Sequence, residues 1–141
     1  MICFCAADLL WATRIKSTAD ALGISCRPTR NLEMLEARLV DSPVRSLIVD
    51  LESGDAGMSL IRRLRGEGVD ETAKAIRIVV FGPHVAAEMF EEAKRAGADV
   101  LMARGAFASR LPEILQRLNA EAGEIKVDSS GDEPDAFIPE G

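Results

Sequence analysis

Short apolar segments alternate five times with stretches of helical periodicity, and this alternation constrains the fold more than any other feature of the sequence. The apolar segments cover about residues 2–6, 24–27, 46–51, 76–81 and 100–102. They lack a polar face, which is typical of parallel strands because helices cover both sides of such a sheet. Each strand–helix–strand unit packs its helix back onto the sheet with right-handed sense. The sequence therefore predicts an α/β fold with a five-stranded parallel sheet and five helices.

The predicted helices have start and stop signals of their own. They cover about residues 9–22, 32–41, 57–65, 85–95 and 109–119. Asp8 occupies an N-cap position before the first helix, and Gly23 ends it. Asn31 is placed to cap the second helix, and Pro112 is tolerated because it falls in the first turn of the last one. Residues 66–75 are polar and predict a loop.

The distribution of charge divides the chain into two parts. Residues 1–120 contain 16 acidic and 16 basic side chains, whereas residues 121–141 contain seven acidic side chains and one lysine. The second part is rich in Gly, Ser and Pro, so we expect one domain over 1–120 and a disordered acidic tail over 121–141. The tail contains the apolar pair Phe137-Ile138. This composition suits a docking motif and equally an inert, solubilising tail.

Several functional classes conflict with the composition. No basic stripe indicates nucleic-acid binding, and no apolar run approaches the ~18 residues of a membrane span. No basic segment precedes the first apolar run, so we expect a cytoplasmic protein. Cys3, Cys5 and Cys26 form an odd set without CxxC spacing, which argues against a disulfide framework and against a zinc site. We expect them to be reduced core residues.

In an open parallel sheet, binding and catalysis collect at the carboxyl ends of the strands. The residues that follow the predicted strands there are Ala6, Ala7, Asp8, Asp50, Gly82, Pro83, His84, Ala103, Arg104 and Gly105. His84 is the single histidine, and we expect it in an exposed loop.

Three spaced segments resemble the receiver (response-regulator, CheY-like) family over about residues 1–119. They are Leu47-Ile48-Val49-Asp50, the helix from Gly57 to Arg65, and the junction Ala93-Lys94-Arg95-Ala96-Gly97-Ala98-Asp99. The resemblance implies a three-layer, doubly wound, flavodoxin/CheY-like sandwich with strand order 2-1-3-4-5. It also implies that Asp50 stands where the family carries its phosphorylated aspartate.

The remaining positions of that chemistry are altered. The family uses an acidic pair after the first strand to hold Mg²⁺, a Ser or Thr after the fourth strand and a Lys after the fifth to contact the phosphoryl oxygens. Counting along the chain places Ala6 and Ala7 at the acidic pair, Gly82 at the hydroxyl and Arg104 at the lysine. Asp8 reaches the metal position only if the register slips by one residue.

The resemblance thus implies a degenerate, stand-alone pseudo-receiver. We expect no enzymatic activity, no metal and no cofactor, and a role in signalling through protein–protein interaction. Asp50 is then a strand-end carboxylate capped by backbone amides or paired with Arg104. The alternative is an active single-domain response regulator, phosphorylated on Asp50 with Mg²⁺ in a two-component phosphorelay.

Phosphate chemistry at Cys5 is a weaker interpretation. Cysteine-phosphorylated transport domains, low-molecular-weight phosphatases and flavodoxins need a phosphate-cradling loop of small or hydroxyl residues after the first strand. Here the segment that follows Cys5 is Ala6-Ala7-Asp8-Leu9-Leu10-Trp11, with Trp11 where such a phosphatase needs an arginine.

Two regions are candidate surfaces for a partner protein. The predicted helix 85–95 carries Met89 and Phe90, of which at least one must face the sheet. Trp11 is a second candidate, although a tryptophan is more often buried. The family resemblance also implies a homodimer through the fourth and fifth predicted helices.

Overall fold

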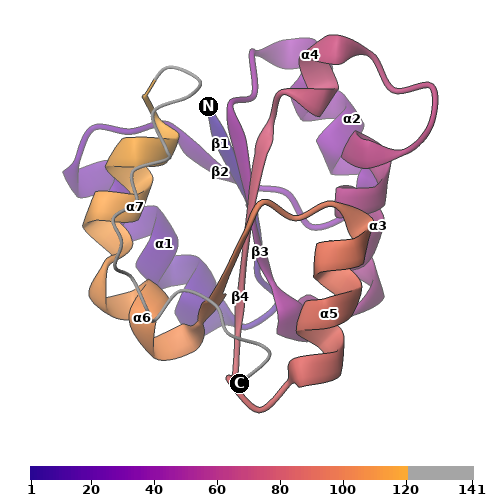
Figure 1. Ribbon diagram of the computed structural model, residues 1–141. Coiled ribbons are helices and arrows are strands. Elements are labelled where there is room, and N and C mark those ends of the chain that lie inside the picture. Colours follow the sequence, from indigo (N-terminus) through magenta and orange to yellow (C-terminus); the bar gives the residue numbers. More distant parts are fainter. Residues whose placement is uncertain (121–141) are drawn as a thin grey trace.

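The computed structural model describes residues 1–120 and contains one parallel sheet between two layers of helices (Figure 1). The sheet has five strands in the order β2-β1-β3-β4-β5. The strands are β1 (Ile2–Cys5), β2 (Cys26–Pro28), β3 (Ser46–Asp50), β4 (Arg77–Gly82) and β5 (Val100–Ala103). All four pairings are parallel. The predicted fold class and strand order are confirmed.

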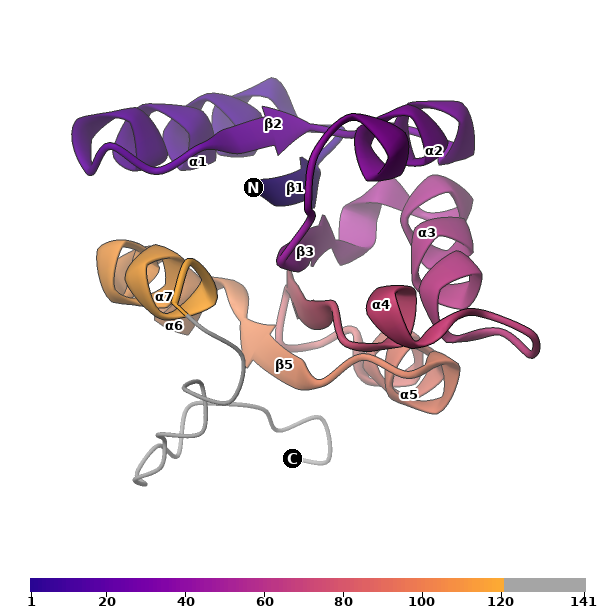
Figure 2. The same cartoon turned by 90° about the horizontal axis from the view of Figure 1, so that it is seen from above.

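The helices segregate to the two faces of the sheet (Figures 1 and 2). They are α1 (Leu9–Ala21), α2 (Leu32–Asp41), α3 (Asp55–Arg65), α4 (Glu71–Lys74), α5 (Ala87–Ala96), α6 (Arg104–Ser109) and α7 (Leu111–Leu118), with a 3₁₀ helix η1 (Leu51–Ser53). Helices α1, α6 and α7 cover one face, and α2, α3 and α5 cover the other. This is the three-layer sandwich that parallel strands require.

The prediction of five helices is wrong, because residues 1–120 form seven α-helices. Helix α4 lies in the segment expected to be a loop, where the Asp70 side chain accepts a hydrogen bond from the amide of Ala73. Buried Ala73 then fixes this single turn against the core. Helix α6 precedes α7, and the two are separated at Arg110. Helices of four and six residues are too short to produce a recognisable apolar period.

Alternating side chains of the strands form two apolar clusters, one on each face of the sheet. Phe81 of β4 stacks on Phe107 of α6 with ring centroids 4.0 Å apart, and Trp11 of α1 packs against both rings. Cys3 and Cys5 belong to the opposite cluster. All three cysteines are buried and free, and burial raises the pKa of Cys26 to about 12. The cysteines therefore lie in the core rather than in a reactive site.

No helix within residues 1–120 is long and apolar enough to cross a membrane. The expected boundary at residue 120 stays a prediction, because the structure describes residues 1–120 alone. The prediction of a disordered tail concerns residues 121–141, which lie outside the described part of the chain.

Candidate functional site

The strand register brings the sequence-predicted positions to one edge of the sheet. Asp50 at the end of β3 lies opposite Phe81 of β4, and Gly82 lies opposite Ala103 of β5. On the other side of β3, Cys5 ends β1 beside Val49. The loops that follow β1, β3, β4 and β5 therefore surround Asp50.

Asp50 is completely buried, although it ends a strand at this edge. Its Oδ1 accepts a hydrogen bond of 3.0 Å from the backbone amide of Glu52 and so caps η1. Its Oδ2 is buried and has no hydrogen-bond partner within residues 1–120. Burial raises the pKa of the Asp50 carboxyl, against the opposing effects of the Glu52 amide and the Arg104 charge. A buried carboxyl with one unsatisfied oxygen favours the protonated form.

Arg104 does not pair with Asp50. Its Nη2 lies 2.9 Å from Oε1 of Glu52, in an ion pair that is about half exposed on the glutamate side. The guanidinium also lies 5.9 Å from the centroid of the Trp11 ring, within cation–π range. Of the two partners considered for Asp50, the backbone amide is present and the arginine is engaged by Glu52 instead.

The space beside Gly82 is filled by Leu51. A Cβ added to Gly82 would lie 2.9 Å from Cδ1 and 3.0 Å from Cβ of Leu51, closer than such carbons approach in proteins. Leu51 is only 3% exposed, so it has little room to withdraw. A serine or threonine at position 82 is therefore incompatible with this arrangement unless Leu51 moves.

On the β1 side, Ala6 and Ala7 have no side-chain oxygen that could bind a metal ion. Asp8 is engaged in the helix cap, where Oδ1 accepts a 2.8 Å hydrogen bond from the amide of Leu10. Within the described residues, no group of three His, Cys, Asp or Glu side chains could hold a metal ion. The donors present do not fit the divalent ion that receiver chemistry uses.

Ser53 links the loops after β1 and β3. Its hydroxyl donates a 3.2 Å hydrogen bond to the carbonyl of Cys5 and accepts a 3.1 Å bond from the amide of Ala7. Sequence reasoning missed this contact because a lone serine in a polar loop carries no motif. The bridge joins the two loops at Ala7, one of the two positions that correspond to the family's acidic pair.

The other predicted positions lie away from Asp50's carboxyl or inside the core. His84 is exposed in the loop before α5. Phe90 is 3% exposed and Met89 is 39% exposed, so the methionine faces outward. Trp11 is only 7% exposed and belongs to the aromatic core, so the buried alternative holds and the ring is not a surface contact.

No known family model matches this chain, and no curated protein matches it. Solved structures do. A response regulator from Thermotoga maritima is 17% identical with a TM-score of 0.65, over 85% of this chain and 97% of that chain. A putative response regulator from Chloroflexus aurantiacus is 19% identical with a TM-score of 0.65, over 82% and 97%.

A third similar structure is the beryllofluoride-activated receiver domain dimer of NtrC4. It is 11% identical with a TM-score of 0.61, over 83% of this chain and 97% of that chain. At these identities the similarity establishes the receiver fold alone. What the site can do chemically has to be argued from the residues of this chain.

Proposed function

We propose that this chain is a receiver-like signalling module of the cytoplasm that acts by binding other proteins, without phosphorylation of Asp50. It is not an enzyme and uses neither Mg²⁺ nor another cofactor. The fold shared with response regulators supports the signalling role. The residues around Asp50 support the loss of phosphate chemistry.

The packing of Leu51 against Gly82 carries the proposal. A phosphoryl group on Asp50 would add a dianion next to the carboxyl, and this charge requires hydrogen-bond donors and cations around it. Here the neighbouring position offers an aliphatic side chain, and Asp50 itself is 0% exposed. An anion at that place would be desolvated without compensation, which is costly.

The opposite side of the site supports the same conclusion. Phosphoryl transfer to a carboxylate brings like charges together, and a divalent ion is the usual means of neutralising them. Ala6 and Ala7 provide no ligand, and the carboxylate of Asp8 is held by the first turn of α1. Within residues 1–120, Arg104 is the cation whose charge acts on Asp50, and its Nη2 lies against Glu52, so it would have to leave this partner to contact a phosphoryl group.

The partners are proteins rather than nucleic acid, because basic and acidic side chains are equal in number over residues 1–120. Val85 and Met89, 78% and 39% exposed, give the region of α5 an apolar surface. The NtrC4 receiver domain forms a dimer. We infer that a second copy of this chain is one partner, through α5 and α7, which are the fourth and fifth helices of the sequence prediction.

Amide spectra of the full chain with Mg²⁺ and beryllofluoride, a phosphoryl mimic, test the proposal. We expect no saturable shifts at Asp50, Gly82 or Arg104. The matched control is Asp50→Asn, in which any remaining shift cannot arise from the carboxylate. Saturable shifts that occur around Asp50 in the wild type and vanish in this variant would establish the active receiver instead.

A further inference from the structure

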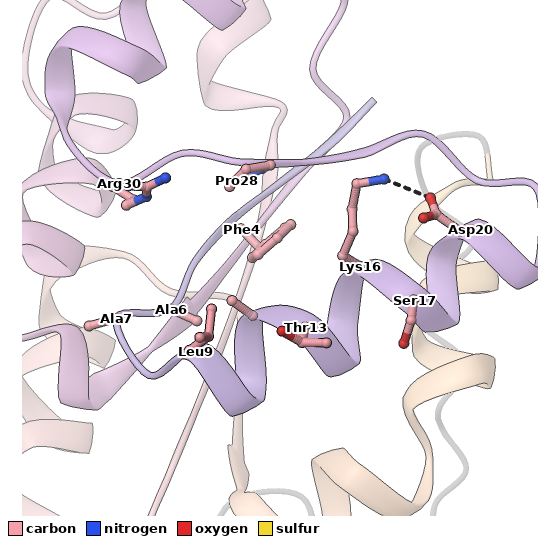
Figure 3. A pocket seen from close by; sticks show the side chains of 11 residues that line it. Phe4, Ala6, Ala7, Leu9, Thr13, Lys16, Ser17, Asp20, Pro28 and Arg30 are labelled. Atoms are coloured by element: carbon pink, nitrogen blue, oxygen red, sulfur yellow. Dashed lines mark hydrogen bonds and ion pairs between the residues drawn. The ribbon is translucent and has the colours of Figure 1, made fainter.

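A groove of about 520 Å³ runs along α1 on the flank that faces the edge strand β2. Its apolar lining includes Phe4, Ala6, Ala12 and Pro28. Figure 3 shows the Phe4 ring pointing into the space between α1 and the segment that carries Pro28 and Arg30. The groove is therefore open to solvent and has an apolar floor.

The first turn of α1 extends this apolar surface. Leu9 lines the groove and is 77% exposed, and its neighbour Leu10 is 71% exposed. Neither leucine belongs to the two core clusters. Large apolar side chains exposed next to an apolar groove indicate a surface that another segment covers.

The rim of the groove is cationic on balance. Lys16 and Arg30 line it together with a single acid, Asp20. Lys16 Nζ lies 2.7 Å from Asp20 Oδ1, but these side chains are 45% and 59% exposed (Figure 3). Such an exposed pair is weak, so Lys16 can exchange this partner for another carboxylate at little cost. The groove thus combines an apolar floor with positive charge.

The occupant does not bind by extending the sheet. Pro28 in the edge strand has no N–H, and its carbonyl already accepts a 2.7 Å hydrogen bond from Nη2 of Arg38. A proline on an edge strand hinders backbone pairing with a further strand. Side-chain anchoring in the groove is the mode that remains.

We propose that residues 121–141 of the same chain dock in this groove, with Phe137 and Ile138 on the apolar floor and neighbouring carboxylates toward Lys16 and Arg30. This segment has seven acidic side chains and one lysine, and the apolar pair lies between acids. Its charge and its anchor residues therefore complement the groove. The assignment goes beyond the proposed function, because it does not depend on the chemistry at Asp50.

The length of the segment allows this contact. The described chain ends just after α7, which packs beside α1 on the same face of the sheet. Phe137 follows Ala120 by 17 residues, which as a flexible chain span about 23 Å and fully extended about 56 Å. That distance exceeds the ~10 Å diameter of a helix, so the apolar pair can pass around α1. Tethering also gives a millimolar effective concentration, so even a weak contact is populated.

A nitroxide placed next to the anchor tests the proposal in the full chain. Ala136→Cys supplies the attachment site, and the three native cysteines are buried. We expect selective loss of amide signal intensity at Ala12, Thr13 and Arg30. The loss should disappear when Lys16→Glu and Arg30→Glu reverse the rim charge. The matched control is Arg62→Glu on α3, an exposed cation on the opposite face, which should leave the loss unchanged.

The same experiment separates the alternatives. Signal loss that appears only in a mixture of labelled and isotope-enriched molecules would assign the occupant to a second copy and overturn the intramolecular assignment. An absence of selective loss, or equal loss in both charge variants, would overturn the docking itself. Thermal unfolding of each variant checks that the domain is intact.

Discussion

Replacement of Asp50 by asparagine should stabilise this protein at neutral pH. The carboxyl is fully buried, one of its oxygens has no partner within residues 1–120, and burial raises its pKa. Ionisation at neutral pH therefore places a poorly compensated charge in the core. Asparagine keeps the oxygen that accepts from the amide of Glu52 and removes the charge.

The magnitude follows from the charge. Asparagine still leaves an unpartnered amide group at the position of Oδ2, so the gain is only the excess cost of burying a charged group over a neutral one at this poorly hydrogen-bonded place. We expect this excess to be on the order of 1–3 kcal/mol near pH 7. For a domain of this size the gain corresponds to a rise of roughly 4–12 °C in Tm.

The gain should depend on pH with a defined sign. The pKa of Asp50 in the folded state lies above its ordinary value of 3.8. At pH values between 3.8 and this raised pKa, the folded state therefore binds more protons than the unfolded state. The wild type therefore loses stability relative to the variant as pH rises through this window. Below the window both side chains are neutral, and the difference should vanish.

Urea unfolding of both proteins from acidic to neutral pH measures the difference directly. Asp20→Asn is the control, because Asp20 is an exposed carboxylate in a weak ion pair and its loss should change stability by less than about 1 kcal/mol. Destabilisation by Asp50→Asn at neutral pH would refute the reasoning, since it would mean that the charged carboxylate is held by favourable contacts.

Three further comparisons of variants test the packing around the site. Gly82→Thr should destabilise the protein by about 1–3 kcal/mol in urea unfolding, because the added side chain meets Leu51. Leu51→Ala in the same chain should cancel part of this loss of stability. If the two losses of stability simply add in the double variant, the contact between positions 51 and 82 is contradicted. Gly57→Ala should destabilise the protein, because the added Cβ would lie 2.7 Å from Cγ1 of Val49. Gly105→Ala meets nothing within 4 Å and should raise the free energy of unfolding by about 0.5–1 kcal/mol. Equal changes in thermal unfolding for the two variants would refute the packing argument. Ser53→Ala should cost about 1 kcal/mol and speed amide exchange in the loop after β1, and unchanged exchange would show that the bridge is dispensable.

The sheet could be predicted from sequence because each strand is a nearly continuous apolar run. The burial of every residue of β1 and β3 reflects that pattern. Helix caps at Asp8 and Asn31 were likewise recognisable, because a polar residue before an apolar period has few other roles. Helices α4 and α6 escaped prediction because one or two turns contain too little periodicity.

The site could be predicted only in part. Counting residues from Gly23 and Gly97 predicted which residues meet at the carboxyl edge of the sheet. The strand register brings Asp50 and Gly82 to that edge. Spacing could not show that Leu51 fills the position beside Gly82, because its residue type also suits the end of a strand. The partner of Arg104 was equally hidden, since Glu52 and Asp50 both lie within reach of that side chain.

The central claim is that Asp50 does not accept a phosphoryl group. Intact-protein mass spectrometry after incubation with Mg²⁺ and a small phosphodonor such as acetyl phosphate measures this directly. The account predicts an unchanged mass for the wild type. A mass gain of one phosphoryl group in the wild type that is absent in Asp50→Asn would contradict it.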